Sequence, residues 1–189
     1  MNTRNMEKEP FHDQAFDKAV EKAIMFVDRA LSDSGRNPKP VLLHSIRVAM
    51  YLYNAHYPKD VVVAAVLHDV LEDTDIKNDE IEREFGLEVL KLVMANTHDR
   101  LMKNIYERDK EMIDRCKQCG KDALLIKAVD IFDNSPYYHY VWETREERDR
   151  LLQKNKYFLD VSSEILAHEP ILDLLMNQYH GLLNSSKST

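Results

Sequence analysis

The sequence has few of the residues that break helices or cross-link chains. Its 189 residues include only 4 glycines, 6 prolines and 2 cysteines. So few glycines and prolines argue against a turn-rich all-β protein and suit a helical one. The longest apolar run is Val61–Leu67, against roughly 20 residues in a helix that spans a bilayer. The first ten residues also lack the apolar core of a secretory signal. We therefore expect a cytoplasmic protein with no membrane partner.

Positive charge is also in short supply, with 26 Lys and Arg against 33 Asp and Glu and a net charge of −7. Because nucleic-acid-binding proteins usually carry a basic surplus or stripe, we expect no nucleic-acid partner. A small anionic ligand stays open, since a metal ion or a few basic groups can neutralise phosphates locally. Cys116 and Cys119 form one C-x-x-C pair, without the second pair of a four-cysteine zinc site. We interpret them as thiols near the end of a helix before Gly120.

Apolar residues recur at three- and four-residue steps along most of the chain, which is the period of amphipathic helices. The first such segment is 15–30, and the segment SDSGRNPKP (32–40) is expected to end it. Further helices are predicted over 41–55, 61–73, 78–85, 87–96, 103–118, 121–134, 144–167 and 170–183. The pattern predicts one all-α domain over 13–183, a bundle of about eight helices, with flexible tails at 1–12 and 184–189.

The most apolar of these helices should begin after Asp60, a candidate N-cap, and lie at the centre of the fold. It ends on four titratable residues, His68, Asp69, Glu72 and Asp73. In a continuous helix His68 would stack on Glu72, and Asp69 on Asp73, since residues four apart share a face. Four such groups at the end of a buried helix are costly to desolvate unless a divalent cation compensates. The alternative is a helix end that has simply reached solvent.

Two more polar residues stand within apolar helices. His44 lies in LLHSIRVAMYL and Asp130 in LLIKAVDIFDN. A lone histidine on such a helix is more often a satisfied core residue, but a buried Asp is rare unless it is paired. Together with His68 and Asp69 they provide two imidazoles and two carboxylates from three helices. That donor set suits a divalent Mn, Fe, Co or Zn ion.

The order of these four residues, H…HD…D, resembles the HD superfamily of metal-dependent phosphohydrolases. Within it, AAVLHDVLEDTDI (64–76) followed by EIEREFG (80–86) closely resembles the hydrolase domain of the RelA/SpoT family and its small stand-alone members. GRNPKPVLLHSIRVA (35–49) resembles that family's R-K-x-G-x-P-Y-x-x-H-P-x-x-V-A, and KAVDIFDN (127–134) resembles its K-L-A-D-K-x-x-N. The resemblance covers roughly residues 15–135. It implies an HD-domain fold.

The resemblance also implies a cofactor and a reaction. The cofactor is one divalent metal ion, with Mn²⁺ favoured over Fe, Co or Zn, held by His44, His68, Asp69 and Asp130. The reaction is hydrolysis of the stringent-response nucleotide (p)ppGpp at its 3′ position, which releases pyrophosphate. Glu72 would then orient or deprotonate the water, and Asp73 would serve the leaving oxygen.

Four residues are candidates for binding the nucleotide. The resemblance implies contacts from Asn134, one turn after Asp130, and from Arg36. Arg47 and Lys127 are further basic residues beside the motifs that could take up phosphate charge. His98 and Asp99 form a second HD pair in a polar turn, without an acidic residue four positions on.

The sequence departs from the family pattern before the first histidine. Val41 stands where the family has Tyr, Ser45 where it has Pro, and the H-x-G-Q turn is missing before Gly35. These positions are expected to shape the nucleotide pocket and to bear on which base is accepted. The aromatic residues that follow Asn134 are expected to pack the next helix more often than to wall that pocket; they are Tyr137, Tyr138, His139, Tyr140 and Trp142.

Two alternatives to this enzyme stay open. One is an HD-type nucleotidase that acts on another nucleotide, and the other is a non-catalytic sensor that binds a nucleotide or a metal. Glu72 and Asp73 favour catalysis, because a pure binder needs the metal ligands but not these two groups. A homo-oligomer is also left open, and no synthetase segment is expected to follow.

Overall fold

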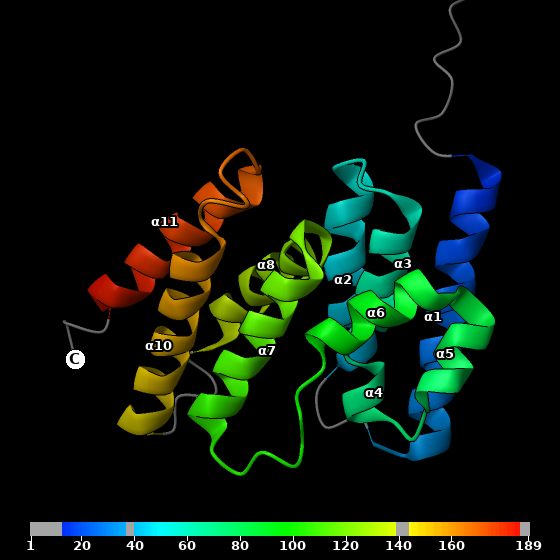
Figure 1. The fold of residues 1–189 in the computed structure, drawn as a ribbon, viewed down its shortest axis with the longest axis horizontal. Helices are drawn as coiled ribbons and strands as arrows, with labels where there is room; N and C mark the ends of the chain where they lie inside the picture. The colour runs from blue at the N-terminus through cyan, green and yellow to red at the C-terminus, as the bar shows by residue number, and fades with distance from the viewer. Residues whose placement is uncertain (1–12, 37–39, 139–143, 186–189) are drawn as a thin grey trace, which may run out of the picture.

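The protein is described by a computed structural model that covers residues 13–36, 40–138 and 144–185, and every regular element in them is helical (Figure 1). The α-helices are α1 (Gln14–Ser34), α2 (Val41–Asn54), α3 (Lys59–Leu67), α4 (Val70–Asp73), α5 (Asn78–Phe85), α6 (Leu87–Asn96), α7 (Ile105–Cys119), α8 (Lys121–Asn134), α10 (Arg145–Ser162) and α11 (Pro170–Ser185). A short 3₁₀ turn, η1 (Ser135–Tyr137), follows α8. The predicted all-α class is therefore confirmed. The expected tail at 1–12 lies outside the described residues.

The ends of the first helix follow its local chemistry. The Asp13 carboxylate accepts a hydrogen bond of 2.7 Å from the backbone N–H of Phe16, which caps α1. The helix ends at Gly35, whose φ of 62° lies in the left-handed region that favours glycine. It runs past the predicted end at residue 30 because Leu31 is buried in the core.

The centre of the fold is α3. Its residues from Val61 to Leu67 are at most 3% exposed, and the helix packs against α1, α2, α6 and α8. The prediction that this segment is central is confirmed. The predicted N-cap is wrong, because α3 begins at Lys59 directly after Pro58, which leaves Asp60 in the first turn.

The expected continuous helix over 61–73 is also wrong. It breaks at His68 and Asp69, which keep right-handed backbone angles but sit in a turn between α3 and α4. The Asp69 carbonyl accepts from the N–H groups of both Glu72 and Asp73, at 3.0 and 2.9 Å, so a new helical turn starts there. The polar residues therefore do not form the two stripes of one helix.

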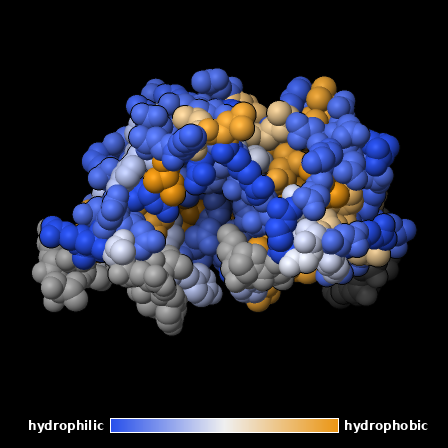
Figure 2. Space-filling model, turned by 90° about the horizontal axis from the view of Figure 1, so that it is seen from below, coloured by the Kyte–Doolittle hydropathy of each residue, from blue (hydrophilic) through white to orange (hydrophobic). Residues whose placement is uncertain are grey.

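The helices form two groups that α8 joins. In Figure 1 α1 to α6 lie on the right and α7, α10 and α11 on the left. Helix α8 packs against α2, α3 and α6 on one side and against α7 and α11 on the other. Figure 2 shows a largely hydrophilic face seen from below, with a hollow between the two groups. Among the described residues, no helix combines the length and apolar character needed to cross a membrane.

Two other predictions near the C-terminal half can be compared directly. Cys116 and Cys119 lie at the end of α7 before Gly120 and are both free thiols, as interpreted. Helix α10 ends at Ser162, short of the predicted residue 167, and a turn connects it to α11.

Candidate metal centre and active site

The four predicted metal ligands converge from three elements. His44 comes from α2, His68 and Asp69 from the turn between α3 and α4, and Asp130 from α8. His44 Nε2 lies 3.1 Å from Asp130 Oδ1 and 3.8 Å from Asp69 Oδ2. His68 Nε2 lies 3.3 Å from Asp69 Oδ1 and 3.7 Å from Asp130 Oδ1. Donors that bind one ion at about 2.0–2.2 Å lie roughly 3–4.4 Å apart. One donor atom each of His44, His68 and Asp130 lies within 4.8 Å of the other two, so these three residues form a possible metal site. Asp69 lies beside both histidines, with a different oxygen facing each one.

His68 is oriented with one nitrogen facing this cluster. Its Nδ1–H donates to the Ala65 carbonyl at 2.8 Å, which leaves Nε2 facing the carboxylates. His68 Nε2 is buried and has no hydrogen-bond partner among the described residues. Burial alone would lower the pKa of His68, but the charges of Asp69 and Asp130 outweigh it and raise the pKa to about 9. A site that attracts a proton this strongly also attracts a metal cation.

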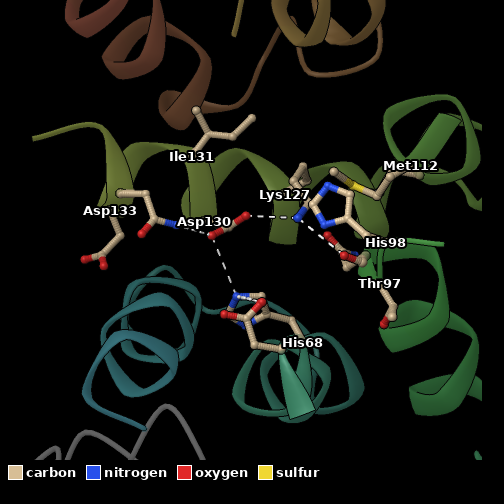
Figure 3. Close-up of polar contacts among 12 residues, drawn as sticks. His68, Thr97, His98, Met112, Lys127, Asp130, Ile131 and Asp133 are labelled. Atoms are coloured by element: carbon tan, nitrogen blue, oxygen red, sulfur yellow. Dashed lines mark hydrogen bonds and ion pairs between the residues drawn. The ribbon is translucent and has the colours of Figure 1, made fainter. Parts of the chain in front are cut away.

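Asp130 is the centre of this cluster, as Figure 3 shows. Its Oδ2 accepts from the Lys127 ammonium at 2.9 Å, and its Oδ1 accepts from the Asn134 amide at 2.6 Å. Burial would raise the pKa of the Asp130 carboxyl, but Lys127 and the two histidines hold it well below its usual range. The carboxylate is therefore ionised and oriented, as a metal ligand must be.

Glu72 is held in place by a residue of the loop after α6. Its Oε1 accepts from the backbone N–H of His98 at 2.8 Å, and His98 Nδ1 lies 3.1 Å from the same oxygen. His98 Nε2 lies 3.0 Å from Asp109 Oδ1, and the other oxygen of Asp109 accepts from Arg150. A chain of alternating charges thus runs from α4 through the loop after α6 to α7 and α10.

The charges of Glu72, His98 and Asp109 stabilise one another. Burial would raise the pKa of Glu72 and of Asp109, but hydrogen bonds from His98 bring both to about 2. Burial would lower the pKa of His98, and its two carboxylate partners raise it instead. Glu72 is therefore an ionised hydrogen-bond acceptor at neutral pH and a weak base.

The predicted nucleotide contacts lie in different environments. Asn134 donates to Asp130 Oδ1, and Lys127, 2% exposed, directs its ammonium to Asp130 and to the Asn96 carbonyl. Arg36 is on the surface and pairs with Asp75. Arg47 binds a carboxylate of α8 and lies over the ring of Tyr137 at 5.7 Å.

The burial of individual side chains decides which of the other residues could line a nucleotide pocket. Val41 and Ser45 are both 1% exposed, so these two departures from the family pattern act on the packing of α2 and offer no surface to a base. Tyr138 is buried and its hydroxyl lies 3.4 Å from the Asn155 side chain, as expected for a residue that packs the next helix. His139, Tyr140 and Trp142 lie outside the described residues.

Sequence reasoning missed three residues of this region: His98, Asp109 and Asp133. In the sequence His98 stands out only as part of an isolated HD pair, because its partners are 26 and 11 residues away. Asp133 contacts His44, which is 89 residues away. The one available signal was a carboxylate three residues after Asp130, one helical turn beyond a predicted ligand.

Comparison with known sequences identifies the family of this chain. A sequence model of the HD domain matches residues 21–122, more than half of the chain. The chain belongs to the HD domain family. The match includes three of the predicted ligands and ends before Asp130, which the geometry adds to them.

Several HD-domain relatives carry more specific names. The chain is 37% identical over 93 residues to the mouse guanosine-3′,5′-bis(diphosphate) 3′-pyrophosphohydrolase MESH1, a match that covers 48% of this chain and 51% of that protein. It is 28% identical over 153 residues to the Aquifex aeolicus guanosine-3′,5′-bis(diphosphate) 3′-pyrophosphohydrolase, covering 79% of this chain and 22% of that protein. The matched region thus spans about half, or less, of these relatives.

A solved structure shows the same architecture. It is described as a metazoan ortholog of SpoT that hydrolyses ppGpp, and it superposes with a TM-score of 0.71 at 26% identity. The superposition covers 91% of this chain and 97% of that one. The HD-domain fold therefore extends over nearly the whole of this chain.

Proposed function

We propose that this protein is a metal-dependent phosphohydrolase that removes pyrophosphate from the 3′ position of (p)ppGpp. The observation that carries the proposal is the grouping of His44, His68 and Asp130, whose donor atoms lie within 4.8 Å of one another, with Asp69 beside both histidines. The names of the matched relatives and of the superposed structure support the choice of reaction. The proposal includes three expectations from the sequence: Mn²⁺ as the ion, the cytoplasm as the compartment, and no nucleic-acid or membrane partner.

The four proposed ligands are of two chemical kinds. The two imidazoles offer neutral nitrogen donors, and the two carboxylates offer charge, a mixed set that suits a borderline divalent ion such as Mn²⁺. When bound, such an ion supplies Lewis acidity, because it lowers the pKa of water and neutralises phosphoryl charge. Lys127 offsets part of the negative charge of Asp130 from the far side of the carboxylate.

Glu72 and Asp73 are the proposed catalytic residues. Glu72 is ionised, and His98 fixes it through both a backbone and a side-chain contact. A carboxylate with a pKa of about 2 accepts a hydrogen bond from water well but stores a proton poorly at neutral pH. We therefore assign Glu72 the task of orienting the attacking water, and Asp73, on the same short helix, the leaving oxygen.

Substrate binding is proposed for the polar groups around this cluster. Asn134 has one amide hydrogen engaged by Asp130, so its second amide hydrogen and its oxygen are the groups offered to a nucleotide. Arg47, whose side chain is 35% exposed, has guanidinium hydrogens left for a phosphate. Arg36 would reach a phosphate only by leaving Asp75.

The test combines metal content and turnover in one pair of variants. Asp69→Ala is expected to lose bound metal and (p)ppGpp hydrolysis together, because it removes a ligand. Asp160→Asn, an exposed position on α10, is expected to keep both. Full hydrolysis by a metal-free Asp69→Ala protein would overturn the proposal. Cleavage of 5′-monophosphates alone would replace it with a nucleotidase, and nucleotide binding without turnover would replace it with a sensor.

A further inference from the structure

The side of His44 that faces away from the metal cluster is occupied by a second carboxylate. Asp133 Oδ2 lies 2.7 Å from His44 Nδ1, on the opposite side of the ring from Asp69 and Asp130. Figure 3 shows Asp133 on the same helix as Asp130. Asp133 therefore contacts the outer nitrogen of His44 and is not one of the converging donors.

Arg47 holds this carboxylate in place. Its Nε and Nη2 donate to the two oxygens of Asp133 at 2.7 and 2.6 Å, a bidentate pair. Such forked pairs fix the plane and direction of a carboxylate as well as its position. The Asp133 side chain is 15% exposed, so solvent competes only weakly with these contacts.

Helices α2 and α8 each carry a candidate ligand and a member of the Arg47–Asp133 pair at the same spacing. Arg47 lies three residues after His44 on α2, and Asp133 lies three residues after Asp130 on α8. Each helix thus presents a candidate ligand and, one turn further on, half of the Arg47–Asp133 pair. The pair crosses between the helices beside the point where the two ligands meet.

We infer that Asp133, clamped by Arg47, is a positioning residue that orients His44 for the metal ion. This inference rests on the proposed metal site. A hydrogen bond from Nδ1–H to Asp133 fixes the tautomer whose Nε2 carries the lone pair, and it fixes the direction of that lone pair toward Asp69 and Asp130. A carboxylate partner also makes the imidazole a better donor to a metal.

His44 and His68 are therefore oriented by hydrogen bonds to different kinds of partner. The Nδ1–H of His68 donates to the Ala65 carbonyl within its own turn, a neutral partner that no side-chain substitution removes. His44 depends on a charged side chain from another helix, so its orientation is open to mutation. This difference makes the inference testable without changing any ligand.

The experiment measures Mn²⁺ affinity by calorimetry on the chelator-treated full chain. Asp133→Asn is expected to weaken binding by about 10–100-fold, the usual loss when a support of a ligating histidine is removed. Arg47→Met is expected to weaken it by a smaller factor, because the carboxylate stays. The matched control is Asp160→Asn, which removes the carboxylate of another ion pair, with Lys156 at 2.6 Å, far along α10 and outside the site.

A spectroscopic readout separates orientation from simple loss of structure. In the Zn²⁺-loaded wild type, long-range nitrogen–proton NMR spectra should show the His44 proton on Nδ1. In Zn²⁺-loaded Asp133→Asn the Nδ1 proton resonance is expected to move upfield, because an amide oxygen accepts a weaker hydrogen bond than a carboxylate does. If circular dichroism shows that Asp133→Asn is unfolded, the same measurements are made on Asp133→Glu and Arg47→Met.

The outcomes distinguish this inference from the function on which it rests. Equal Mn²⁺ affinity in the wild type and in folded Asp133→Asn would overturn the positioning role and leave the metal site intact. A wild type that binds no divalent ion would overturn both. A wild type that binds Mn²⁺ tightly and does not hydrolyse (p)ppGpp, with weakened binding in Asp133→Asn, would overturn the proposed reaction and uphold the role of Asp133.

Discussion

At the scale of single residues, the proposed chemistry depends most on Glu72, whose carboxylate His98 keeps ionised and fixed. Glu72→Gln keeps the size of the side chain and removes its charge. We expect this variant to retain its metal and to lose on the order of 10²–10⁴ in kcat, the usual size of an acid–base or water-positioning contribution. Stopped assays of pyrophosphate release, with metal content measured on the same samples, check it.

The control for this substitution is Glu82→Gln on the exposed face of α5, which should behave as the wild type. Full turnover in a metal-loaded Glu72→Gln protein would remove Glu72 from the mechanism. Loss of metal in the same variant would instead make Glu72 a ligand.

Lys127 is the buried positive charge of the candidate site, at 2% exposure and 2.9 Å from Asp130. Lys127→Met leaves the carboxylate without this partner, and removing one member of a buried ion pair costs about 3–5 kcal/mol. We expect the chelator-treated variant to unfold at lower urea than the wild type. Added Mn²⁺ should then stabilise the variant more than the wild type, because the ion replaces the missing positive charge.

Lys156→Met provides the comparison, since Lys156 forms an exposed ion pair with Asp160 and such substitutions usually change stability by about 0.5 kcal/mol or less. Equal urea midpoints for Lys127→Met and the wild type would contradict the role given to Lys127.

The residues that could be predicted are those whose signal lies along one helix. Asp130 and His44 were identifiable because a charged or imidazole side chain interrupts an apolar helix, and the structure places both in the cluster. The partners of His98 and Asp133 come from other parts of the fold, so their roles were not identifiable, and the only local signal was the place of Asp133 one turn after Asp130. Lys127 was expected to bind a phosphate, but its side chain is buried and its ammonium binds Asp130.

At the scale of elements, the break between α3 and α4 determines how the site is arranged. Both residues at the break keep right-handed backbone angles and are compatible with a helix, so the sequence predicts no interruption. The break frees Glu72 from stacking on His68, and Glu72 contacts His98 instead. Element identities were predictable from periodicity, whereas the break accompanies a contact between Glu72 and His98, 26 residues away in the loop after α6.

The contact of His98 with Glu72 and Asp109 also predicts how stability depends on pH. The raised pKa of His98 means that its charge stabilises the fold below its unfolded pKa of about 6.5 and stops doing so as pH rises through the folded value. The lowered pKa values of Glu72 and Asp109, about 2, contribute stability above about pH 4 that is lost as pH falls toward 2.

We therefore expect His98→Asn to cost most stability at about pH 5–6, by roughly 1–3 kcal/mol for hydrogen bonds to charged groups. The cost should shrink toward pH 2 and toward alkaline pH. Urea unfolding of both proteins across this range checks it, with the exposed His180→Asn on α11 as the control. A cost that does not change with pH would show that His98 acts by packing alone.

At the scale of the whole molecule, the candidate site lies where the two groups of helices meet. Three of the four ligands come from α2 and from the turn after α3, and the fourth comes from α8, which also packs against α7 and α11. The four ligands therefore meet where α8 packs against α2 and α3. The all-α class and the central place of α3 could be predicted from periodicity, but the way α8 joins the groups could not, because it depends on contacts distant in sequence.

The central claim is metal-dependent release of pyrophosphate from the 3′ position of ppGpp. The most direct measurement incubates the chelator-treated protein with ppGpp before and after reloading with Mn²⁺, and separates the products by anion exchange. We predict GDP and pyrophosphate in equal amounts only after reloading, and neither with Asp69→Ala. A reloaded protein that has bound Mn²⁺ and leaves ppGpp intact, or a chelated protein that cleaves it at the same rate, would contradict the account.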